Sequence, residues 1–381
     1  MGAEFRYGVE VGRDVTLDEL RAQGFKAFYV AIGCQGGRLA GIPGEDAEDV
    51  TVAVDFLREV NSGKIDTLSG RTIVVGGGNV AIDVARNACR LGSEHVEMFC
   101  LESEAQMPAS EEERREAIED GAHISCGWGP KEVHLDETGR VCGITFKRCT
   151  RVFDDKGRFA PEYDENDLRR VDADRVVMSI GQSIVWGDLL AGSKVELGRG
   201  QGVLADPQTY QTAEPDIFVG GDVYTGPSFA IDAIAAGHEA AVSIHRFVQP
   251  GSTLTIGRNQ RRYTALDRDD VVLEGYDNAS REVAHVDRER EKAAPFSEYV
   301  ETFTEEQVRA ETARCLGCGA SIVDPNKCIG CGLCTTKCAF DAIHLDRDRP
   351  ECSTMVKYEQ KLPSLGKYAL KRAIKIKFGK K

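Results

Sequence analysis

The stretch Arg71–Cys100, RTIVVGGGNVAIDVARNACRLGSEHVEMFC, decides the fold of the central part of the chain. An apolar run, Thr72–Val75, leads directly into three glycines, and a helical pattern of apolar residues begins after them. A second apolar run, His95–Cys100, follows the helical segment. Strand, glycine turn, helix and strand in this order predict a parallel α/β sheet of the dinucleotide-binding type.

The glycines form the GxGxxA version of the dinucleotide fingerprint. Gly76 permits the tight turn, Gly78 lets the backbone approach a pyrophosphate, and Ala81 keeps the helix close to the strand. The N-terminus of the helix then faces the negative charge of the ligand. A glycine-rich turn without a ligand is the alternative, but the flanking strand and helix favour a nucleotide site. The predicted contact residues of the turn are Gly76, Gly77, Gly78, Asn79, Val80 and Ala81.

Leu101 and Glu102 follow the second strand, where the adenosine ribose of a dinucleotide is expected to lie. A carboxylate at this position accepts hydrogen bonds from a free 2′-OH and repels a 2′-phosphate. The pair therefore predicts NAD(H) as the coenzyme. A solvated turn charge is the alternative interpretation of Glu102.

A second motif lies near the C-terminus, in PNKCIGCGLCTTKCAFDAIHL, where the cysteines have C-x2-C-x2-C-x3-C spacing. This spacing is typical of ferredoxin-type [4Fe-4S] centres, whereas zinc sites use two cysteine pairs with a longer loop between them. One cluster is expected. A second remains open, because Cys318 or Cys352 could supply the fourth ligand of the first. The candidate metal ligands are Cys315, Cys318, Cys328, Cys331, Cys334 and Cys338.

Composition excludes several classes of function. The net charge of −14 argues against nucleic acid as the main partner, and no apolar run approaches the length of a membrane span. The chain has 13 cysteines, and many of them gather at cluster-like spacing. This pattern indicates a reducing cytoplasm with one metal-bearing segment.

Three stretches carry a family resemblance. The first is GGGNVAIDVARNACRLG followed by Met107-Pro108-Ala109. The second is FYVAIG of residues 28–33 followed by GIPGED, and the third is TAEPDIFVGGD of residues 212–222. All three resemble the small (beta) subunit of glutamate synthase and its iron–sulfur flavoprotein relatives. The resemblance implies a pyridine-nucleotide domain inserted into an FAD-binding domain, with Asp222 bonded to the ribityl chain of FAD. It also implies a fused C-terminal ferredoxin module. The further cofactor-binding residues expected are Leu101, Glu102, Gly33, Gly181, Gly221 and Asp222.

The chain departs from this family in three ways. No N-terminal fingerprint for the ADP part of FAD is found, so we expect that the chain is truncated or that another polypeptide completes the flavin domain. Members that use NADPH carry two arginines where this chain has Leu101 and Glu102, which again indicates NADH. The amino-terminal cysteine domain that docks to the glutamate synthase large subunit is absent, so glutamate synthesis is not expected.

The expected fold class is α/β, with a Rossmann-like NAD(P)-binding domain inserted in a partial FAD-binding domain of the two-dinucleotide-binding flavoprotein type. A small α+β ferredoxin-like module follows. The expected division is 1–68 and 183–250 for the two parts of the FAD-binding domain and 69–182 for the NAD(H)-binding domain. Residues 251–300 are expected to be a linker or a crossing strap, 301–352 the 4Fe-4S module and 353–381 a basic tail.

The expected function is electron transfer between NADH, FAD and a [4Fe-4S] cluster, to or from a protein acceptor or a catalytic partner subunit. No side chain is assigned a catalytic role. One alternative is a thioredoxin-reductase-like disulfide reductase, and another is a truncated chain that binds NADH and a cluster without activity. The reductase requires a CxxC pair in the nucleotide domain, and the cysteines there are too far apart in sequence to form one: Cys89, Cys100, Cys126, Cys142 and Cys149.

Overall fold

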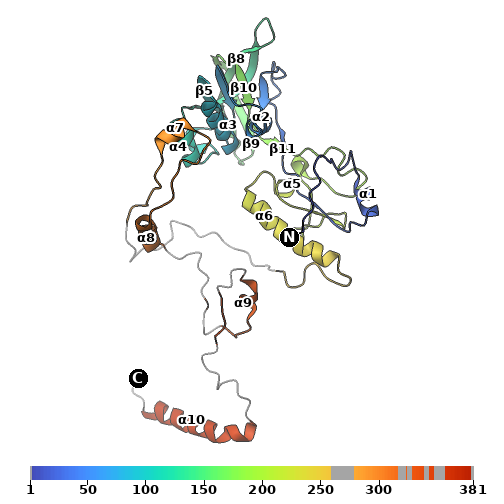
Figure 1. The fold of residues 1–381 in the computed structure, drawn as a ribbon, viewed down its shortest axis with the longest axis vertical. Helices are drawn as coiled ribbons and strands as arrows, with labels where there is room; N and C mark the ends of the chain where they lie inside the picture. Colours follow the sequence, from blue (N-terminus) through green and yellow to red (C-terminus); the bar gives the residue numbers. More distant parts are fainter. Residues whose placement is uncertain are drawn as a thin grey trace. The chain divides into compact units, whose positions relative to one another are not determined.

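The computed structural model describes residues 2–258, 279–315, 323, 328–338, 343–346 and 357–378. The chain divides into two compact units (Figure 1). The first comprises Met1–Val272 and Val286–Glu301, and the second comprises Leu273–His285 and Thr302–Lys381. Cys318 and Cys352 lie outside the described residues.

A five-stranded parallel sheet forms the centre of the first unit, as the sequence predicts. Its interior strands are apolar on both faces, since Ile73 and Val74 are fully buried although they are adjacent in the sequence. Burial on both faces is typical of parallel strands covered on each side. In spatial order the strands are β3 (Val50–Val52), β10 (Arg175–Met178), β4 (Arg71–Val75), β5 (His95–Cys100) and β6 (His123–Cys126).

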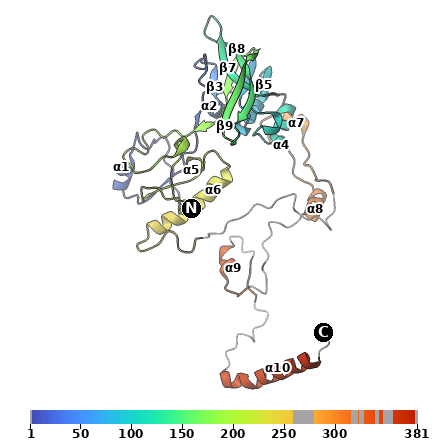
Figure 2. The ribbon, with the colours of Figure 1, turned by 180° about the vertical axis from the view of Figure 1, so that it is seen from behind.

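Each face of this sheet packs against a different layer (Figures 1 and 2). One face packs against the helices α2 (Ala53–Asn61), α3 (Asn79–Arg90) and α4 (Glu111–Glu119). The other packs against an antiparallel sheet of β7 (Trp128–Leu135), β8 (Val141–Phe153) and β9 (Phe159–Val171).

An aromatic pair joins the two sheets. Phe99 of β5 and Phe146 of β8 are both fully buried, and their rings stack with centroids 3.9 Å apart. This contact holds the antiparallel sheet against the strand that leads to Leu101 and Glu102.

A smaller lobe of the first unit contains the parallel strands β1 (Phe28–Val30) and β12 (Ile217–Val219). Around them lie α1 (Leu17–Ala22), η2 (Arg199–Gln201), α5 (Asp222–Thr225) and α6 (Ala230–Phe247). The short helix η1 (Glu104–Gln106) follows β5 outside this lobe. The chain leaves this lobe through β2 (Gly36–Gly37) and returns through β11 (Gln182–Ser183), and these two strands pair antiparallel. The five-stranded sheet is therefore inserted between the two halves of the smaller lobe.

Residues 286–301, which we call the strap, pack on the helical face of the larger lobe. The strap contains α7 (Arg288–Ala293), which lies beside α4 in both views (Figures 1 and 2). Arg90 of α3 donates hydrogen bonds to the Tyr299 hydroxyl at 2.7 Å and to the Asp120 carboxylate at 3.2 Å. Part of the segment 251–300 is thus fixed to the larger lobe. This lobe contains the five-stranded sheet with the glycine turn, and we call it the nucleotide lobe below.

The second unit is described only in pieces. These contain α8 (Glu305–Ala313), α9 (Leu333–Lys337) and α10 (Tyr358–Phe378). The described side chains of the basic tail in α10 are exposed. Within the described ranges of the whole chain, the helices are too short or too polar to cross a lipid bilayer.

The turn after β4 depends on the absence of a side chain at residue 76. Gly76 has φ of 142°, and a Cβ there would lie 2.2 Å from the carbonyl oxygen of Ser179. Gly78 has φ of −89°, and a Cβ there would meet no atom within 4 Å. The two glycines of the fingerprint therefore have different roles: the first is required by the fold, and the second leaves space open to a ligand.

We predict that Gly76→Ala destabilises the nucleotide lobe by about 2 kcal/mol or more, because a strained φ adds to a clash with backbone. Gly78→Ala should change the free energy of unfolding by only about 0.5 kcal/mol. Urea unfolding followed by the fluorescence of the two tryptophans, Trp128 and Trp186, measures both. Equal stability of the two variants would contradict the role assigned to Gly76.

Candidate functional site

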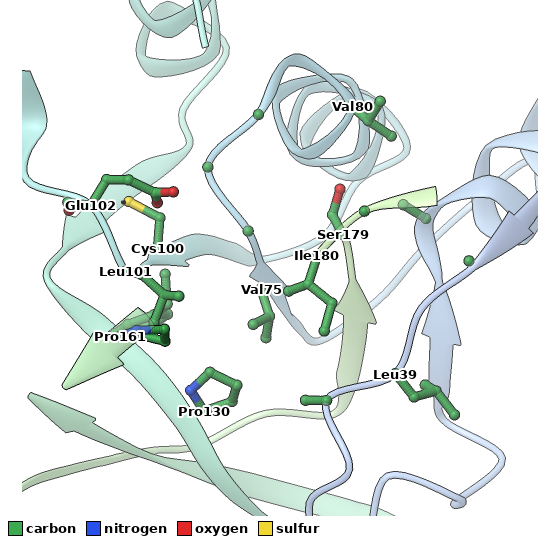
Figure 3. A pocket seen from close by; sticks show the side chains of 18 of the residues that line it. Leu39, Val75, Val80, Cys100, Leu101, Glu102, Pro130, Pro161, Ser179 and Ile180 are labelled. Carbon is green, nitrogen blue, oxygen red and sulfur yellow. Dashed lines mark hydrogen bonds between the residues drawn. The ribbon is translucent and has the colours of Figure 1, made fainter. Parts of the chain in front are cut away.

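A cavity of about 790 Å³ opens at the carboxyl ends of β4, β5 and β10 (Figure 3). Ligands of open α/β sheets bind in the crevice outside the carboxyl ends of the strands. The cavity brings together most of the residues expected to bind the nucleotide, namely Gly76, Gly77, Gly78, Asn79, Val80, Leu101, Glu102 and Gly181.

The fingerprint turn offers backbone donors to this cavity. Helix α3 begins after Gly78, which has extended backbone and no side-chain cap. The first N–H groups of a helix have no intrahelical acceptor, and they attract anions. Ala81 lies beneath the turn and is fully buried. The open side of Gly78 and the uncapped helix end fit the pyrophosphate of a dinucleotide.

The segment after η1 holds the turn in place. Ala109 donates its backbone N–H to the carbonyl oxygen of Gly77 at 3.0 Å, and Ser110 donates its backbone N–H to Asn79 Oδ1 at 3.2 Å. Met107 and Ala109 are buried beside α3. The Met107-Pro108-Ala109 motif, which the sequence offered only as a resemblance, thus closes one side of the fingerprint turn.

Glu102 lies directly beside the fingerprint turn. Its Oε2 is 3.1 Å from the position that a Cβ on Gly77 would occupy, and its carbonyl oxygen accepts the backbone N–H of Gly127 at 2.9 Å. Figure 3 shows its side chain on the same side of the cavity as Cys100. Within the described part of the chain, its carboxylate has no cationic partner within 4 Å. An unpaired carboxylate at the end of β5 fits a pair of ribose hydroxyls.

The antiparallel sheet supplies a wall of the cavity that the sequence did not predict. Trp128, Lys147 and Tyr163 all line it. Lys147 Nζ lies 2.7 Å from Glu165 Oε1 and 4.2 Å from the centroid of the Tyr163 ring. A local motif could not identify these residues, because they come from three strands that meet only in the folded protein. The cavity thus contains a cation whose charge is already paired.

The residues expected to bind FAD meet in the smaller lobe, at the carboxyl ends of β1 and β12. A Cβ on Gly33 would lie 3.8 Å from Asp222 Oδ2. Gly221 has φ of 67°, and Asp222 begins the short helix α5 rather than the long helix α6. Asp222 Oδ1 accepts the backbone N–H of Ser228 at 3.3 Å. A carboxylate between two glycines at the ends of parallel strands fits the ribityl chain of a flavin. Gly181 instead lines the cavity at the ends of β4, β5 and β10, which we call the coenzyme cavity.

The cluster cysteines are described in part. The loop of the C-x2-C-x2-C run contains Gly330 and Gly332 with φ of 68° and 75°, which bend the chain between successive thiols. Among the described residues, no three metal-ligating side chains converge on one point. The fit to an iron–sulfur cluster rests on the donor set, since thiolates are the ligands that these clusters use. Four of the described cysteines of this segment are free thiols: Cys315, Cys328, Cys331 and Cys334.

The fold brings together two cysteines that are far apart in the sequence. Cys100 and Cys126 are 26 positions apart, yet their Sγ atoms lie 3.7 Å from each other. The two residues face each other at the ends of the neighbouring strands β5 and β6. The nucleotide lobe therefore contains a close pair of thiols, although it has no CxxC motif.

Comparison with protein families gives two matches. The family model for pyridine nucleotide-disulphide oxidoreductases matches residues 5–237, and the model for the 4Fe-4S binding domain matches residues 321–344. A solved structure, FprA of Mycobacterium tuberculosis in complex with NADPH, has a TM-score of 0.51 at 21% identity over 62% of this chain and 67% of that chain. The predicted fold class is thereby confirmed.

Three curated relatives illustrate the range of similar proteins. The NADP(+)-dependent formate dehydrogenase subunit beta of Moorella thermoacetica is 32% identical, and the match covers 84% of this chain and 46% of the relative. The glutamate synthase [NADPH] small chain of Escherichia coli K12 is 32% identical, and the match covers 65% of this chain and 56% of the relative. The NAD-dependent dihydropyrimidine dehydrogenase subunit PreT of Escherichia coli O157:H7 is 30% identical, and the match covers 65% of this chain and 54% of the relative.

The chain spans about half the length of the curated relatives it matches. The resemblance to the glutamate synthase small subunit and its iron–sulfur relatives is confirmed. By the extent of its match, the chain belongs to the pyridine nucleotide-disulphide oxidoreductase family and carries a 4Fe-4S binding domain.

Proposed function

We propose that the chain is the NADH-dependent electron-transfer part of an iron–sulfur flavoprotein oxidoreductase, and that it works with a partner subunit or a protein acceptor in the cytoplasm. The observation that carries the proposal is the cavity in which the fingerprint turn and the unpaired carboxylate of Glu102 lie together. The same chain holds Asp222 with its two glycines and the four-cysteine run. Relatives named as subunits of larger enzymes support the partner.

The protein's own residues bind and orient the cofactors. The N-terminus of α3 and the open side of Gly78 hold the pyrophosphate, and Glu102 accepts hydrogen bonds from the ribose. Asp222 holds the ribityl chain in the smaller lobe. Bound flavin supplies the exchange between a two-electron hydride and single electrons, and the cluster carries single electrons. Because no proton has to be moved by a side chain in this exchange, we assign no catalytic residue.

A disulfide reductase is less well supported. That reaction needs a dithiol that faces the flavin, and the close thiol pair of this chain lies elsewhere. Cys100 lines the coenzyme cavity beside Gly77, and the flavin residues Gly33 and Asp222 do not line that cavity. Electron transfer to the 4Fe-4S domain therefore remains the better supported function.

The choice of NADH rests on the charges around the ribose position. The names of the relatives include both NAD and NADP, so family membership does not decide the coenzyme. A 2′-phosphate beside Glu102 would meet an unpaired carboxylate. Lys147 lines the same cavity, but its ammonium group already pairs with Glu165 at 2.7 Å, a carboxylate that Lys131 also contacts at 3.3 Å. The local charge thus favours a free 2′-OH over a 2′-phosphate.

We predict that the protein binds NADH about ten- to a hundredfold more tightly than NADPH, because a hydrogen bond to a charged group contributes about 1.5–3 kcal/mol. Replacing both Leu101 and Glu102 with arginine should reverse the preference. Glu104→Arg is the control, since it makes the same charge reversal as the change at Glu102, two residues away on an exposed side chain outside the cavity. Equilibrium titrations with both coenzymes measure the ratio. Equal or tighter binding of NADPH by the unmodified protein would overturn the assignment.

The cluster assignment is tested through iron content. Cys331→Ser should remove most of the iron from anaerobically purified protein, because one thiolate ligand is lost. NADH affinity should stay unchanged, since Cys331 lies outside the unit that holds the coenzyme cavity. Cys142→Ser, in β8, is the matched control and should keep its iron. Full iron content in the Cys331 variant would exclude this residue as a ligand.

The electron-transfer function is tested in both directions. We expect that NADH reduces the cluster of the full chain supplied with FAD, or that the chemically reduced protein converts NAD⁺ to NADH. Anaerobic absorbance and electron paramagnetic resonance follow the cluster. The Cys331→Ser variant should lose the cluster signal while it still binds NADH. Failure in both directions, with FAD and cluster present, would refute the proposed function.

A further inference from the structure

The thiol pair of the nucleotide lobe has no part in the function proposed above. We propose that Cys100 and Cys126 form a reversible disulfide, and that this modification weakens binding of the coenzyme. Both residues are free thiols whose Sγ atoms lie 3.7 Å apart. Cys100 lines the coenzyme cavity, and Cys126 is partly exposed. The inference rests on the position of this pair beside the binding site.

The backbone geometry permits the bond. Cys100 and Cys126 are direct partners in the register of β5 and β6, so their side chains project from the same face of the sheet. Neighbouring strands lie about 4.8 Å apart, which is within the range of about 4.4–6.8 Å found between the Cα atoms of disulfides. Side-chain rotation and a small backbone adjustment are therefore enough to bring the sulfur atoms together.

The contacts of the two cysteines explain why a disulfide between them should weaken coenzyme binding. A Cβ on Gly77 would lie 2.8 Å from Cys100 Cβ, so the fingerprint turn packs directly against this side chain. The Cys100 thiol donates to the carbonyl oxygen of Glu102 at 3.7 Å, and the N–H of Gly127 donates to the same oxygen at 2.9 Å. Gly127 directly follows Cys126. A bond between the two sulfur atoms would therefore displace the glycine turn and Glu102 together.

The two thiols differ in their surroundings, and this assigns their roles. Cys126 is the more exposed, so it is the thiol that attacks an incoming oxidant. Burial and the neighbouring Cys126 raise the pKa of the Cys100 thiol well above its usual value. Cys100 therefore acts second, when the departing thiolate can accept its proton. The attack of Cys126 followed by that of Cys100 requires a small-molecule disulfide as the oxidant.

The reaction balances as two thiol–disulfide exchanges. The Cys126 thiolate attacks one sulfur of the small disulfide, which forms a mixed disulfide and releases one thiolate. That thiolate takes the proton of Cys100, and Cys100 then attacks the Sγ of Cys126 and releases the second thiolate, which takes up the Cys126 proton from solvent. Two protein thiols are oxidised, and one small disulfide is reduced to two thiols. Excess of a reduced small thiol reverses both steps.

The experiment uses the full chain with its cluster, incubated anaerobically with oxidised glutathione. Peptide mass spectrometry should identify a Cys100–Cys126 cross-link with the loss of two hydrogens, and tandem spectra separate it from cross-links between cluster cysteines. NADH titration of the same sample should show binding about five- to tenfold weaker than in the reduced protein. Addition of reduced dithiothreitol should restore the affinity.

Two variants and one protection test make the result decisive. Cys126→Ser should bind NADH normally when reduced and should lose both the cross-link and the response to oxidised glutathione. Cys142→Ser should keep both. Because coupling between sites is reciprocal, saturating NADH should lower the equilibrium constant for forming the cross-link, measured in glutathione redox buffers, by a similar factor. A stable mixed disulfide on Cys126 without the cross-link, or a cross-link that leaves NADH affinity unchanged, would overturn the proposal.

Discussion

Gly76 approaches the backbone of Ser179 so closely that no side chain can stand between them, and the position of the coenzyme cavity depends on this contact. The amide of Gly76 donates to the carbonyl oxygen of Phe99 at 2.8 Å, and the amide of Ser179 donates to that of Val75 at 2.7 Å. The ends of β5 and β10 are thereby tied to the turn after β4. Because these strand ends form the floor of the cavity, the same contact sets the direction in which α3 points its N-terminus.

Charge in the cavity is arranged unevenly around this fixed turn. Backbone N–H groups at the start of α3 provide positive potential for a pyrophosphate, while Glu102 provides an unpaired negative charge close by. The Lys147 ammonium group does not compensate Glu102, because it pairs with Glu165 on the neighbouring strand. The protein therefore separates an anion-binding site from an anion-repelling site within one cavity. In the function proposed here, this separation would distinguish coenzymes by the charge on the ribose rather than by their size.

The fold around the fingerprint could be predicted because its determinants are local. Strand β5 spans His95–Cys100 as predicted, and α3 begins directly after the third glycine. The wall formed by Trp128 and Tyr163 could not be predicted, since it depends on how β7 and β9 pack across the end of the sheet. The same limit explains why the close thiol pair was not predicted: spacing along the chain reveals a CxxC motif, but it does not reveal partners in the register of parallel strands.

The strap shows a further long-range constraint, which composition concealed. Low periodic apolar content in this charged segment predicts either a linker or a crossing strap, and its charged and polar groups dock on α3 and α4. Asp120 is the centre of this contact, because its carboxylate accepts from Arg86 Nε at 2.8 Å and from Arg90 Nε at 3.1 Å. Arg90 also reaches Tyr299 of the strap. Helix α3 is thus held at its N-terminus by the glycine turn and near its C-terminus by the strap. A displacement of either end would therefore shift the helix that we propose binds the pyrophosphate.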